Sequence, residues 1–447
     1  MARTSKRKEC LLISVDKQPY IIPANWCWIS VGSINQYKSE SVEPKKQPNS
    51  LFELYSVPSS AENYPEIVFG KEIGSTKQAV EKGDVLLCKI NPRINRVWEV
   101  SQHTNHDLLA SSEWIIIRNH KINSSYLMYC FRSPYFRDYM LTNVSGVGGS
   151  LMRAQPKYVK EYPIPLPPFA EQQRIVERIE SLFAKLDEAK EKAQSVVDGF
   201  ENRKAAILHK AFTGELTAEW RETKRISYET WVSTKLSDEC EINPPKLNVK
   251  ALPDDMEVSF FPMPSLSEVY GAITEPQIRQ LKEVRKGFTN FSEGDVVFAK
   301  ITPCMENGKS AVIGKLVNDI GFGTTEFFVL RCGKRLFNRF LWHLVRARFF
   351  RDEAKTEMTG AVGQQRVPKS FIENYSLHLP TVEEQIEIVN ILDECFEKEQ
   401  QAKEAAERVI EKIDIMKKSI LARAFRGELG TNDPNDEPAE ELLKRVL

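Results

Sequence analysis

The 447-residue chain carries an internal repeat, and this feature limits its possible folds more than any other. Residues 207–216 (ILHKAFTGEL) return as residues 420–429 (ILARAFRGEL), 213 positions later. Glu171-Gln172 meets Glu384-Gln385 at the same offset. Self-similarity at a long, fixed interval indicates a duplicated architecture, so the fold is expected to contain two similar halves.

The chain upstream of these motifs repeats less strictly. Residues 83–85 (GDV) match residues 294–296 (GDV) at a slightly different offset, and Trp28 and Trp231 open the two halves. A rigid element tolerates no insertions, whereas surface loops change length freely. Each half is therefore predicted to be a variable globular domain followed by a rigid element.

The rigid element is predicted to be a long helix in each half. Apolar residues recur in alternating steps of three and four, which is typical of a coiled-coil seam. The pattern is interrupted at Arg203 and at Glu399. The predicted seam residues are Ile175, Ile179, Leu182, Leu186, Val196, Phe200, Ile388, Leu392, Val409, Ile413, Met416 and Ile420. We expect the two helices to pair with each other, antiparallel; packing on their own domains or on another subunit is the alternative.

The fold class predicted is mixed α/β, with two globular domains separated by two long antiparallel coiled-coil helices and an internal pseudo-twofold duplication. The expected divisions are a first domain (1–166), a first helix (167–222), a second domain (223–379), a second helix (380–430) and an acidic tail (431–447). Each domain should combine short strands with one helix, at about 125–140 and 338–356. The last residues of the tail could form a short helix that docks a partner.

No catalytic motif is evident in the sequence. Residues 243–246 (NPPK) lack the aromatic residue that an adenine methyltransferase motif needs, and residues 308–310 (GKS) lack the earlier glycine of a phosphate-binding loop. The eight cysteines and six histidines are scattered, which favours free thiols over a zinc site or disulfides. We therefore expect no catalytic residue, no metal and no cofactor on this chain.

Two loops in each half are candidate DNA contacts. Residues 89–96 correspond to 300–309, and 146–155 correspond to 360–366; all four loops are rich in side chains that contact phosphates or base edges. Ordinary surface loops are the alternative. Basic stretches at 114–137 and 331–351 suit phosphates, or else are solvated helix faces. The candidate residues are Lys89, Asn91, Arg93, Asn95, Arg96, Arg153, Lys157, Lys300, Thr302, Asn307, Lys309, Gln364, Gln365 and Arg366.

The sequence resembles the specificity subunits of type I restriction–modification systems up to about residue 430. The resemblance rests on residues 167–176, 205–221 (AAILHKAFTGELTAEWR), 294–310 (GDVVFAKITPCMENGKS) and 419–429 (SILARAFRGEL). It implies two target-recognition domains that each read one half of a bipartite double-stranded DNA site. The helices would then be the spacer between them.

The resemblance also implies the partners. Two methyltransferase subunits would hold S-adenosylmethionine for adenine-N6 methylation, and restriction subunits would use ATP and Mg²⁺. The chain itself would be a non-catalytic, cytoplasmic DNA-binding protein. Two other readings remain open: an adenine methyltransferase that acts alone, and a scaffold that binds proteins rather than DNA.

Overall fold

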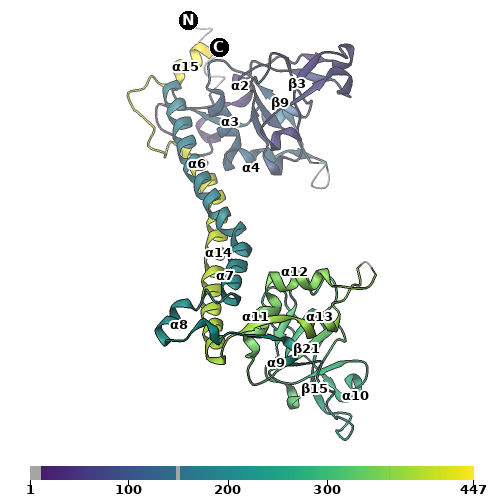
Figure 1. Ribbon diagram of the computed structural model, residues 1–447. Helices are drawn as coiled ribbons and strands as arrows, with labels where there is room; N and C mark the ends of the chain where they lie inside the picture. Colours follow the sequence, from purple (N-terminus) through teal and green to yellow (C-terminus); the bar gives the residue numbers. More distant parts are fainter. Residues whose placement is uncertain (1–11, 147–151, 362, 447) are drawn as a thin grey trace. The chain divides into compact units, whose positions relative to one another are not determined.

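The computed structural model describes residues 12–146, 152–361 and 363–446. The chain divides into two compact units, Met1–Ala193 with Arg408–Leu447 and Gln194–Glu407 (Figure 1). Each unit therefore contains one globular domain together with stretches of both long helices. The mixed α/β fold with two domains and long helices is confirmed.

The first domain is built around two sheets. The larger sheet has the strand order β2-β5-β8-β3-β4 and the smaller has the order β7-β6-β9. β3 and β8 run parallel, whereas the other pairs in these two sheets are antiparallel. The strands are β1 (Cys27–Ser30), β2 (Ser41–Val42), β3 (Leu51–Tyr55), β4 (Glu66–Phe69), β5 (Lys77–Ala79), β6 (Val85–Cys88), β7 (Val97–Glu99), β8 (Asp107–Ala110), β9 (Trp114–Ile117), β10 (Val144–Ser145), β11 (Arg153–Ala154) and β12 (Pro163–Leu166). The helices are α2 (Val31–Ile34), α3 (Ser124–Arg132), α4 (Pro134–Thr142) and α5 (Pro156–Val159), with 3₁₀ turns η1 (Val15–Lys17), η2 (Pro44–Lys46), η3 (Ser59–Ala61), η4 (Gly70–Glu72) and η5 (Pro92–Ile94).

The second domain repeats this plan. Its sheets have the orders β16-β15-β20-β17 and β14-β21-β18-β19, and β15 pairs with β20 in parallel as β3 does with β8. The strands are β13 (Val232–Lys235), β14 (Cys240–Ile242), β15 (Glu257–Phe261), β16 (Gln277–Gln280), β17 (Thr289–Phe291), β18 (Val296–Ala299), β19 (Ser310–Val312), β20 (Gly321–Gly323), β21 (Phe327–Cys332) and β22 (Ser376–Leu379). The helices are α8 (Ala218–Lys224), α9 (Leu236–Glu239), α10 (Leu281–Val284), α11 (Asn338–Arg346), α12 (Arg348–Thr356) and α13 (Lys369–Asn374), with turns η6 (Tyr228–Thr230), η7 (Met263–Ser265) and η8 (Val317–Asp319).

The helix predicted in each domain is in fact two helices. In the first domain Ser133 separates α3 from α4 and caps α4, because its Oγ accepts the Phe136 N–H and Pro134 occupies the first helical position. In the second domain Ala347 separates α11 from α12, with extended backbone and a fully buried side chain. Residues 338–356 contain no proline or glycine that would indicate this second break, so the sequence predicts one continuous helix there.

The long helices lie within the ranges predicted for them, 167–222 and 380–430. The first is interrupted once, between α6 (Phe169–Asp198) and α7 (Phe200–Phe212), and the second is the single 43-residue helix α14 (Val382–Ala424). The Arg203 side chain lies against this break: it donates to the Val196 carbonyl over 2.9 Å, and a Cβ on Gly199 would lie 2.4 Å from its guanidinium. Arg203 also donates to Glu399 Oε2 over 2.8 Å, so the two residues that interrupt the predicted seam bind each other.

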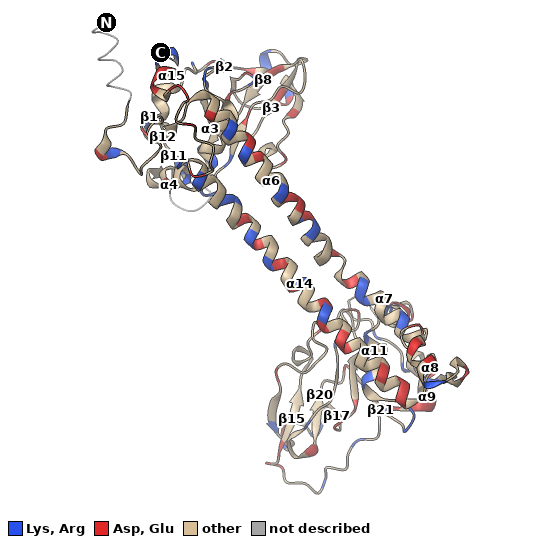
Figure 2. Cartoon of the chain, turned by 90° about the vertical axis from the view of Figure 1, so that its left-hand side faces the viewer, with Lys and Arg blue, Asp and Glu red and all other residues tan. Residues whose placement is uncertain are grey.

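Within each unit the helices run antiparallel. In the first unit Asp187 pairs with Lys417 and Lys190 with Asp414, so residue numbers rise on α6 as they fall on α14. In the second unit the Lys403 ammonium lies 4.8 Å from the Phe200 ring centre, and Arg203 pairs with Glu399. Figure 2 shows charged residues of both signs along these helices. Such charge pairs favour the observed antiparallel register.

Two residues were assigned wrongly to the seam. Ile175, Ile179, Ile388, Leu392 and Ile413 are buried as predicted, but Val409 and Met416 are 42% and 50% exposed. Ile410 and Lys417, one residue further along, are half-buried instead. The Lys417 ammonium lies 5.0 Å from the Phe183 ring centre, because a lysine stem can cover an apolar surface while its charge stays in water. The apolar periodicity alone could not identify a lysine as a seam residue.

The tail packs on the first domain. Its helix α15 (Ala439–Val446) was predicted as a helix that docks a partner. Its apolar face is instead covered by the first domain, because Ala439, Leu442 and Leu443 are buried in that domain's core. The Ala439 N–H donates to the Asn25 carbonyl over 2.9 Å. The acidic tail is therefore part of the first unit.

Candidate nucleic-acid interface

The two candidate loops of each domain lie side by side, joined by a short backbone bridge. In the first domain the Asn91 N–H donates to the Met152 carbonyl and the Ala154 N–H donates to the Lys89 carbonyl, both over 2.8 Å. In the second domain the Thr302 N–H donates to the Gln365 carbonyl over 3.0 Å, and the Val367 N–H donates to the Lys300 carbonyl over 2.9 Å. The paired bridge residues are Ile90 with Arg153 and Ile301 with Arg366. Of the loop 146–155, residues 147–151 lie outside the described residues, as does Val362 of the loop 360–366.

Each bridge carries an arginine that is tied to a glutamate but still reaches the surface. Arg366 binds Glu326 through two hydrogen bonds of 2.9 Å, and Arg153 faces Glu113 at 3.4 and 3.5 Å. The arginine side chains are 43% and 44% exposed. The hydrogen bond from Arg366 lowers the pKa of Glu326 and in turn raises the pKa of Arg366. These contacts hold the two guanidinium groups in corresponding places.

The glutamates were not among the predicted site residues, although the sequence contained a signal for them. Glu113 and Glu326 are separated by 213 positions, as are Arg153 and Arg366. The same offset relates the strictly repeated helical motifs. The Lys89 and Lys300 N–H groups also donate to the carbonyls of Glu113 and Glu326, over 3.0 and 2.9 Å.

Asn91, Asn95 and Thr302 do not fit the base contacts expected of them in this conformation. The side-chain oxygens of all three are buried and have no hydrogen-bond partner. Asn91 and Asn95 have φ angles of 46° and 54°, a left-handed conformation that asparagine tolerates better than most residues. The turn around η5 therefore accounts for both asparagines.

The other candidates are distributed around the bridges. Arg93, Lys157 and Gln364 are exposed, and Lys89, Arg96, Lys300, Gln365 and Arg366 are half-buried or partly engaged. Asn307 donates to Glu268 Oε2 over 3.0 Å, and Lys309 Nζ lies 3.5 Å from the Met263 carbonyl. These last two contacts tie the 300–309 loop to its own domain.

Several arginines of the basic stretches bind groups of their own domains, which differs both from a phosphate contact and from a solvated helix face. In the first domain Arg118 forms two hydrogen bonds with Asp84, while Arg132 and Arg137 donate to backbone carbonyls. In the second domain Arg331 binds Asp295 in the same way as Arg118 binds Asp84. Arg346 donates to the carbonyls of Gly308, Glu268 and Val269, and so fixes two loops.

The repeated Glu-Gln pair connects each long helix to its domain. Glu171 Oε2 accepts the Trp26 indole N–H over 2.6 Å, and Glu384 Oε2 accepts that of Trp231 over 3.0 Å. Trp26 is therefore the counterpart of Trp231, and the matching of Trp28 with Trp231 was wrong. Trp26 and Glu171 are 145 residues apart whereas Trp231 and Glu384 are 153 apart, because the loosely repeated domain between them changes length.

The glutamine of the pair holds the start of a domain helix. Gln172 Oε1 accepts the Asn123 N–H just before α3, and its amide donates to the Pro167 carbonyl. Gln385 does the same for Phe337, just before α11, and for Pro380. The strict repeat of Glu-Gln thus reflects a structural joint between rigid helix and variable domain.

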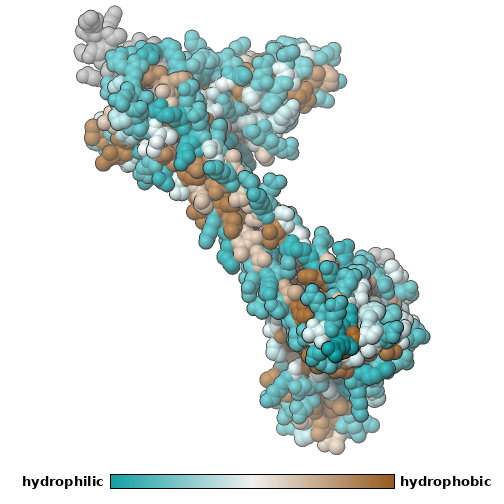
Figure 3. Space-filling view, turned by 60° about the vertical axis from the view of Figure 1, so that its left-hand side comes forward, coloured by the Kyte–Doolittle hydropathy of each residue, from teal (hydrophilic) through white to brown (hydrophobic). Residues whose placement is uncertain are grey.

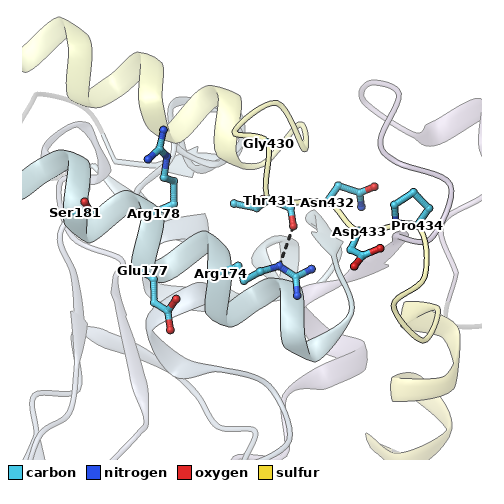
Figure 4. A pocket seen from close by; sticks show the side chains of 9 residues that line it. All are labelled: Arg174, Glu177, Arg178, Ser181, Gly430, Thr431, Asn432, Asp433 and Pro434. Atoms are coloured by element: carbon cyan, nitrogen blue, oxygen red, sulfur yellow. Dashed lines mark hydrogen bonds between the residues drawn. The ribbon is translucent and has the colours of Figure 1, made fainter.

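Each Glu also receives contacts from the segment that follows a long helix. Glu384 binds Thr217 and Arg221, and Glu171 binds Thr431 and Asn432. Burial raises the pKa of Glu171, while hydrogen bonds from Trp26, Asn432 and Thr431 oppose the rise. Figure 4 shows the segment from Gly430 to Pro434 beside Arg174 on α6, around a cleft of about 570 Å³. Arg174 donates to the Thr431 carbonyl over 3.0 Å and binds Asp436. The residues of this cleft therefore hold the tail against α6.

Two motif-like strings are structural. Asn243, with φ 54°, exchanges hydrogen bonds with Val329 at the end of β14. Gly308, with φ 76°, lies in the turn before β19. The bend at Asn243 agrees with reading residues 243–246 as a turn.

Comparison with known proteins agrees with this geometry. Residues 62–196 and 228–411 match the family described as type I restriction modification DNA specificity domain. The specificity subunit of the Escherichia coli enzyme EcoAI is 36% identical over 258 residues, covering 48% of this chain and 43% of that protein. That of E. coli EcoEI is 34% identical over 260 residues, covering 49% and 43%. The chain thus spans less than half the length of these two relatives.

Solved structures share the fold. The HsdS subunit from Thermoanaerobacter tengcongensis has a TM-score of 0.64 at 20% identity, over 93% of this chain and 100% of that one. A chain from a structural study of complex assembly in the type I R-M system has a TM-score of 0.68 at 20% identity, over 92% and 100%.

Proposed function

The chain belongs to the family of type I restriction–modification DNA specificity domains, and from this premise we propose that it is the non-catalytic subunit that selects the DNA sequence in such a complex. Each domain reads one half of a bipartite double-stranded target. The observation that carries this proposal is the duplicated bridge, which presents Arg153 and Arg366 at corresponding places in the two domains.

The residues at the bridges divide into two roles. Lys89, Arg93, Lys157 and Lys300 suit the phosphate backbone, because lysine and arginine neutralise phosphates without reading sequence. Arg153, Arg366, Gln364 and Gln365 have forked side chains that suit base edges in the major groove. The tether from Glu113 or Glu326 limits the positions that each arginine can take, which favours one reading geometry.

The long helices act as the spacer between the half-sites. A 43-residue helix is about 65 Å long at ~1.5 Å per residue, about two turns of DNA. The target-recognition domains lie within 1–166 and 223–379, and the spacer helices α6, α7 and α14 lie within 167–222 and 380–430.

The helices also offer a surface for partners. Val409, Ile415 and Met416 are 42%, 65% and 50% exposed, and Figure 3 shows apolar side chains along the paired helices of this region. Exposed apolar side chains that gather on one face suit contact with another protein. Two methyltransferase subunits bind the chain, and restriction subunits join them in the full complex.

All bond-making chemistry lies on those partners. The methyltransferase subunits hold S-adenosylmethionine and the restriction subunits hold ATP and Mg²⁺, so this chain needs no cofactor of its own. The complex works in the cytoplasm, where its DNA lies. Within the described residues, no helix has the length and hydropathy needed to span a bilayer.

The test is to map methylated adenines in DNA from cells that carry the chain with its methyltransferase partner, as wild type and as Arg153→Ala or Arg366→Ala. We expect a bipartite motif, with each substitution relaxing one half-site and leaving the other intact. A single continuous motif, or loss of both half-sites together, would contradict the assignment of one half-site to each domain.

A second measurement separates the remaining alternatives. The purified chain, mixed with duplex DNA and S-adenosylmethionine but no partner, should transfer no methyl group; transfer would identify an autonomous methyltransferase. Salt-independent association with DNA, or none at all with the methyltransferase subunit present, would favour a protein-binding scaffold.

A further inference from the structure

Two free cysteines of the second domain face each other across adjacent strands. Cys240 begins β14, Cys332 ends β21, and the two are register partners in this antiparallel pair. Side chains directly opposite in an antiparallel pair project from the same face of the sheet. Among the cysteines that the structure describes, no other two are paired in this way.

The neighbouring hydrogen bonds show which kind of opposing pair this is. The Gly333 N–H donates to the Glu239 carbonyl, and the Asn243 N–H donates to the Val329 carbonyl, each over 2.7 Å. Hydrogen-bonded and non-hydrogen-bonded pairs alternate along an antiparallel ladder. Glu239–Gly333 and Asn243–Val329 are hydrogen-bonded pairs. Cys240–Cys332 is one step along the ladder from the first and three steps from the second, so it is a non-hydrogen-bonded pair.

At such a pair the Cα atoms are about 4.5 Å apart and the side chains are at their closest. Disulfides span Cα separations of about 4.4–6.8 Å. The two thiols can therefore be joined with little movement of the backbone, at the short end of the usual range.

We propose that Cys240 and Cys332 are an oxidisable dithiol that closes to a disulfide in the folded second domain. The oxidant is a small-molecule disulfide of the glutathione type. One cysteine thiolate attacks a sulfur of the oxidant, forms a mixed disulfide and releases one small thiol; the second cysteine then attacks the mixed disulfide and releases the other. The two protein thiols lose two protons and two electrons in total, and the small disulfide is reduced to two thiols.

The surroundings determine the order and rate of these steps. Burial raises the pKa of both thiols to about 12, and the neighbouring Cys240 contributes to the rise at Cys332. Exchange is slow at neutral pH because thiolate is scarce. Cys332 is half-buried whereas Cys240 is buried and donates to the Leu236 carbonyl over 3.1 Å, so the oxidant enters at Cys332.

Closure would change the stability of one domain only. The cross-link encloses residues 241–331, which include the candidate loop 300–309. A cross-link that restricts a long segment of the unfolded chain raises the melting temperature, here by roughly 5–15 °C for the second domain. A reductant such as dithiothreitol reverses the change.

The experiment uses the folded full-length chain, treated with glutathione disulfide at pH 8.5, quenched with acid, denatured and alkylated. We expect peptide mass spectrometry to find Cys240 and Cys332 joined and inaccessible to the alkylating agent, while Cys88 and Cys130 are alkylated. Dithiothreitol should restore both thiols. Cys332→Ser should abolish the cross-link, whereas the matched control Cys395→Ser should leave it unchanged.

Three outcomes would overturn the proposal. Both thiols could remain alkylatable after prolonged oxidation of the folded chain. Cys332 could join Cys304 or another cysteine at equal yield. The cross-link could form only after the chain is unfolded by urea, which would show that the native strand pairing does not bring the thiols together.

Discussion

The two domains are joined to the long helices at the same positions, but the residues that bind at these positions differ. Glu171 and Glu384 occupy the same place, yet Glu384 binds the buried cation Arg221, whereas Glu171 binds the neutral Asn432. At one register position of the parallel strands, buried Glu53 accepts the N–H groups of His103 and Thr104, while Ser259 accepts that of Val317. The duplication thus preserved the positions that fix the backbone, and the chemistry at those positions diverged.

The packing of domain against long helix shows the same divergence. Tyr129 on α3 contacts Phe183 with ring centres 6.0 Å apart, and His343 on α11 contacts Phe396 at 5.9 Å. An aromatic ring is kept in both places, but only in the second domain is the ring at this position a histidine. Each domain can therefore be perturbed alone and the other used as its control.

The largest effect is expected at the Glu joints. Glu384→Ala leaves the Arg221 charge buried without its partner and should destabilise the second domain by about 3–5 kcal/mol. Glu171→Ala leaves only neutral donors and should destabilise the first domain by about 1–3 kcal/mol. Urea unfolding followed by hydrogen exchange in each domain measures both. The exposed neighbour variant Glu383→Ala should change little, and equal losses at the two joints would show that the Arg221 charge is unimportant.

The helix seam gives the next largest effect. Ile413 is 2% exposed and Met416 is 50% exposed, so Ile413→Ala should destabilise the first unit by about 2–4 kcal/mol and Met416→Ala by less than about 0.5 kcal/mol. Thermal unfolding of the two variants measures the difference. A greater loss for Met416→Ala in the isolated chain would restore the original seam assignment.

The bridge arginines should have smaller and separate effects on binding. Arg153→Ala and Arg366→Ala should each lose about 1–3 kcal/mol of binding free energy for the cognate half-site, without changing the preference at the other. Fluorescence anisotropy with the methyltransferase partner and half-site mutant duplexes measures this. Lys157→Ala is the contrasting variant: it should weaken all sequences alike and reduce the salt dependence.

The smallest effect is a pH dependence confined to the second domain. Burial lowers the pKa of His343, and Asp393, whose Oδ1 lies 3.6 Å from Nε2, opposes this, while Arg339 and Arg346 add to it. The pKa of His343 in the folded domain lies below the unfolded value of 6.5. The free energy of unfolding is therefore at its full value above pH 6.5 and decreases as the pH falls, by at most about 1.4 kcal/mol per pH unit.

The check is the free energy of unfolding of the second domain between pH 5 and 7. Wild type should lose stability over this range, and His343→Gln should lose less. The first domain, with Tyr129 at the corresponding place, serves as the internal control. An identical slope in the variant would place the dependence on another group.

The sequence predicted what repetition and periodicity can carry. The duplication and the two long helices within 167–222 and 380–430 followed from patterns that local physics enforces. The pairing of the loops was suggested only by their parallel order along the chain, since the bridge between Ile90 and Arg153 is a long-range contact.

The errors also have physical causes. Lys417 at the seam was missed because a half-buried lysine does not show in an apolar pattern, and Trp28 was mistaken for Trp26 because the loosely repeated region shifts the offset. Neither reading of the basic stretches included internal ion pairs, since a sequence does not show that Arg118 and Arg331 bind Asp84 and Asp295. Glu113 and Glu326 could have been found by applying the 213-residue offset to charged residues as well.

The tail has a consequence for how the protein is made. Leu421, Phe425, Leu442 and Leu443 belong to the core of the first domain, and the ribosome synthesises them after the whole second domain. The first domain must therefore leave the exit tunnel with an open core while the second domain is still being made. It is translated before the second domain but completed after it.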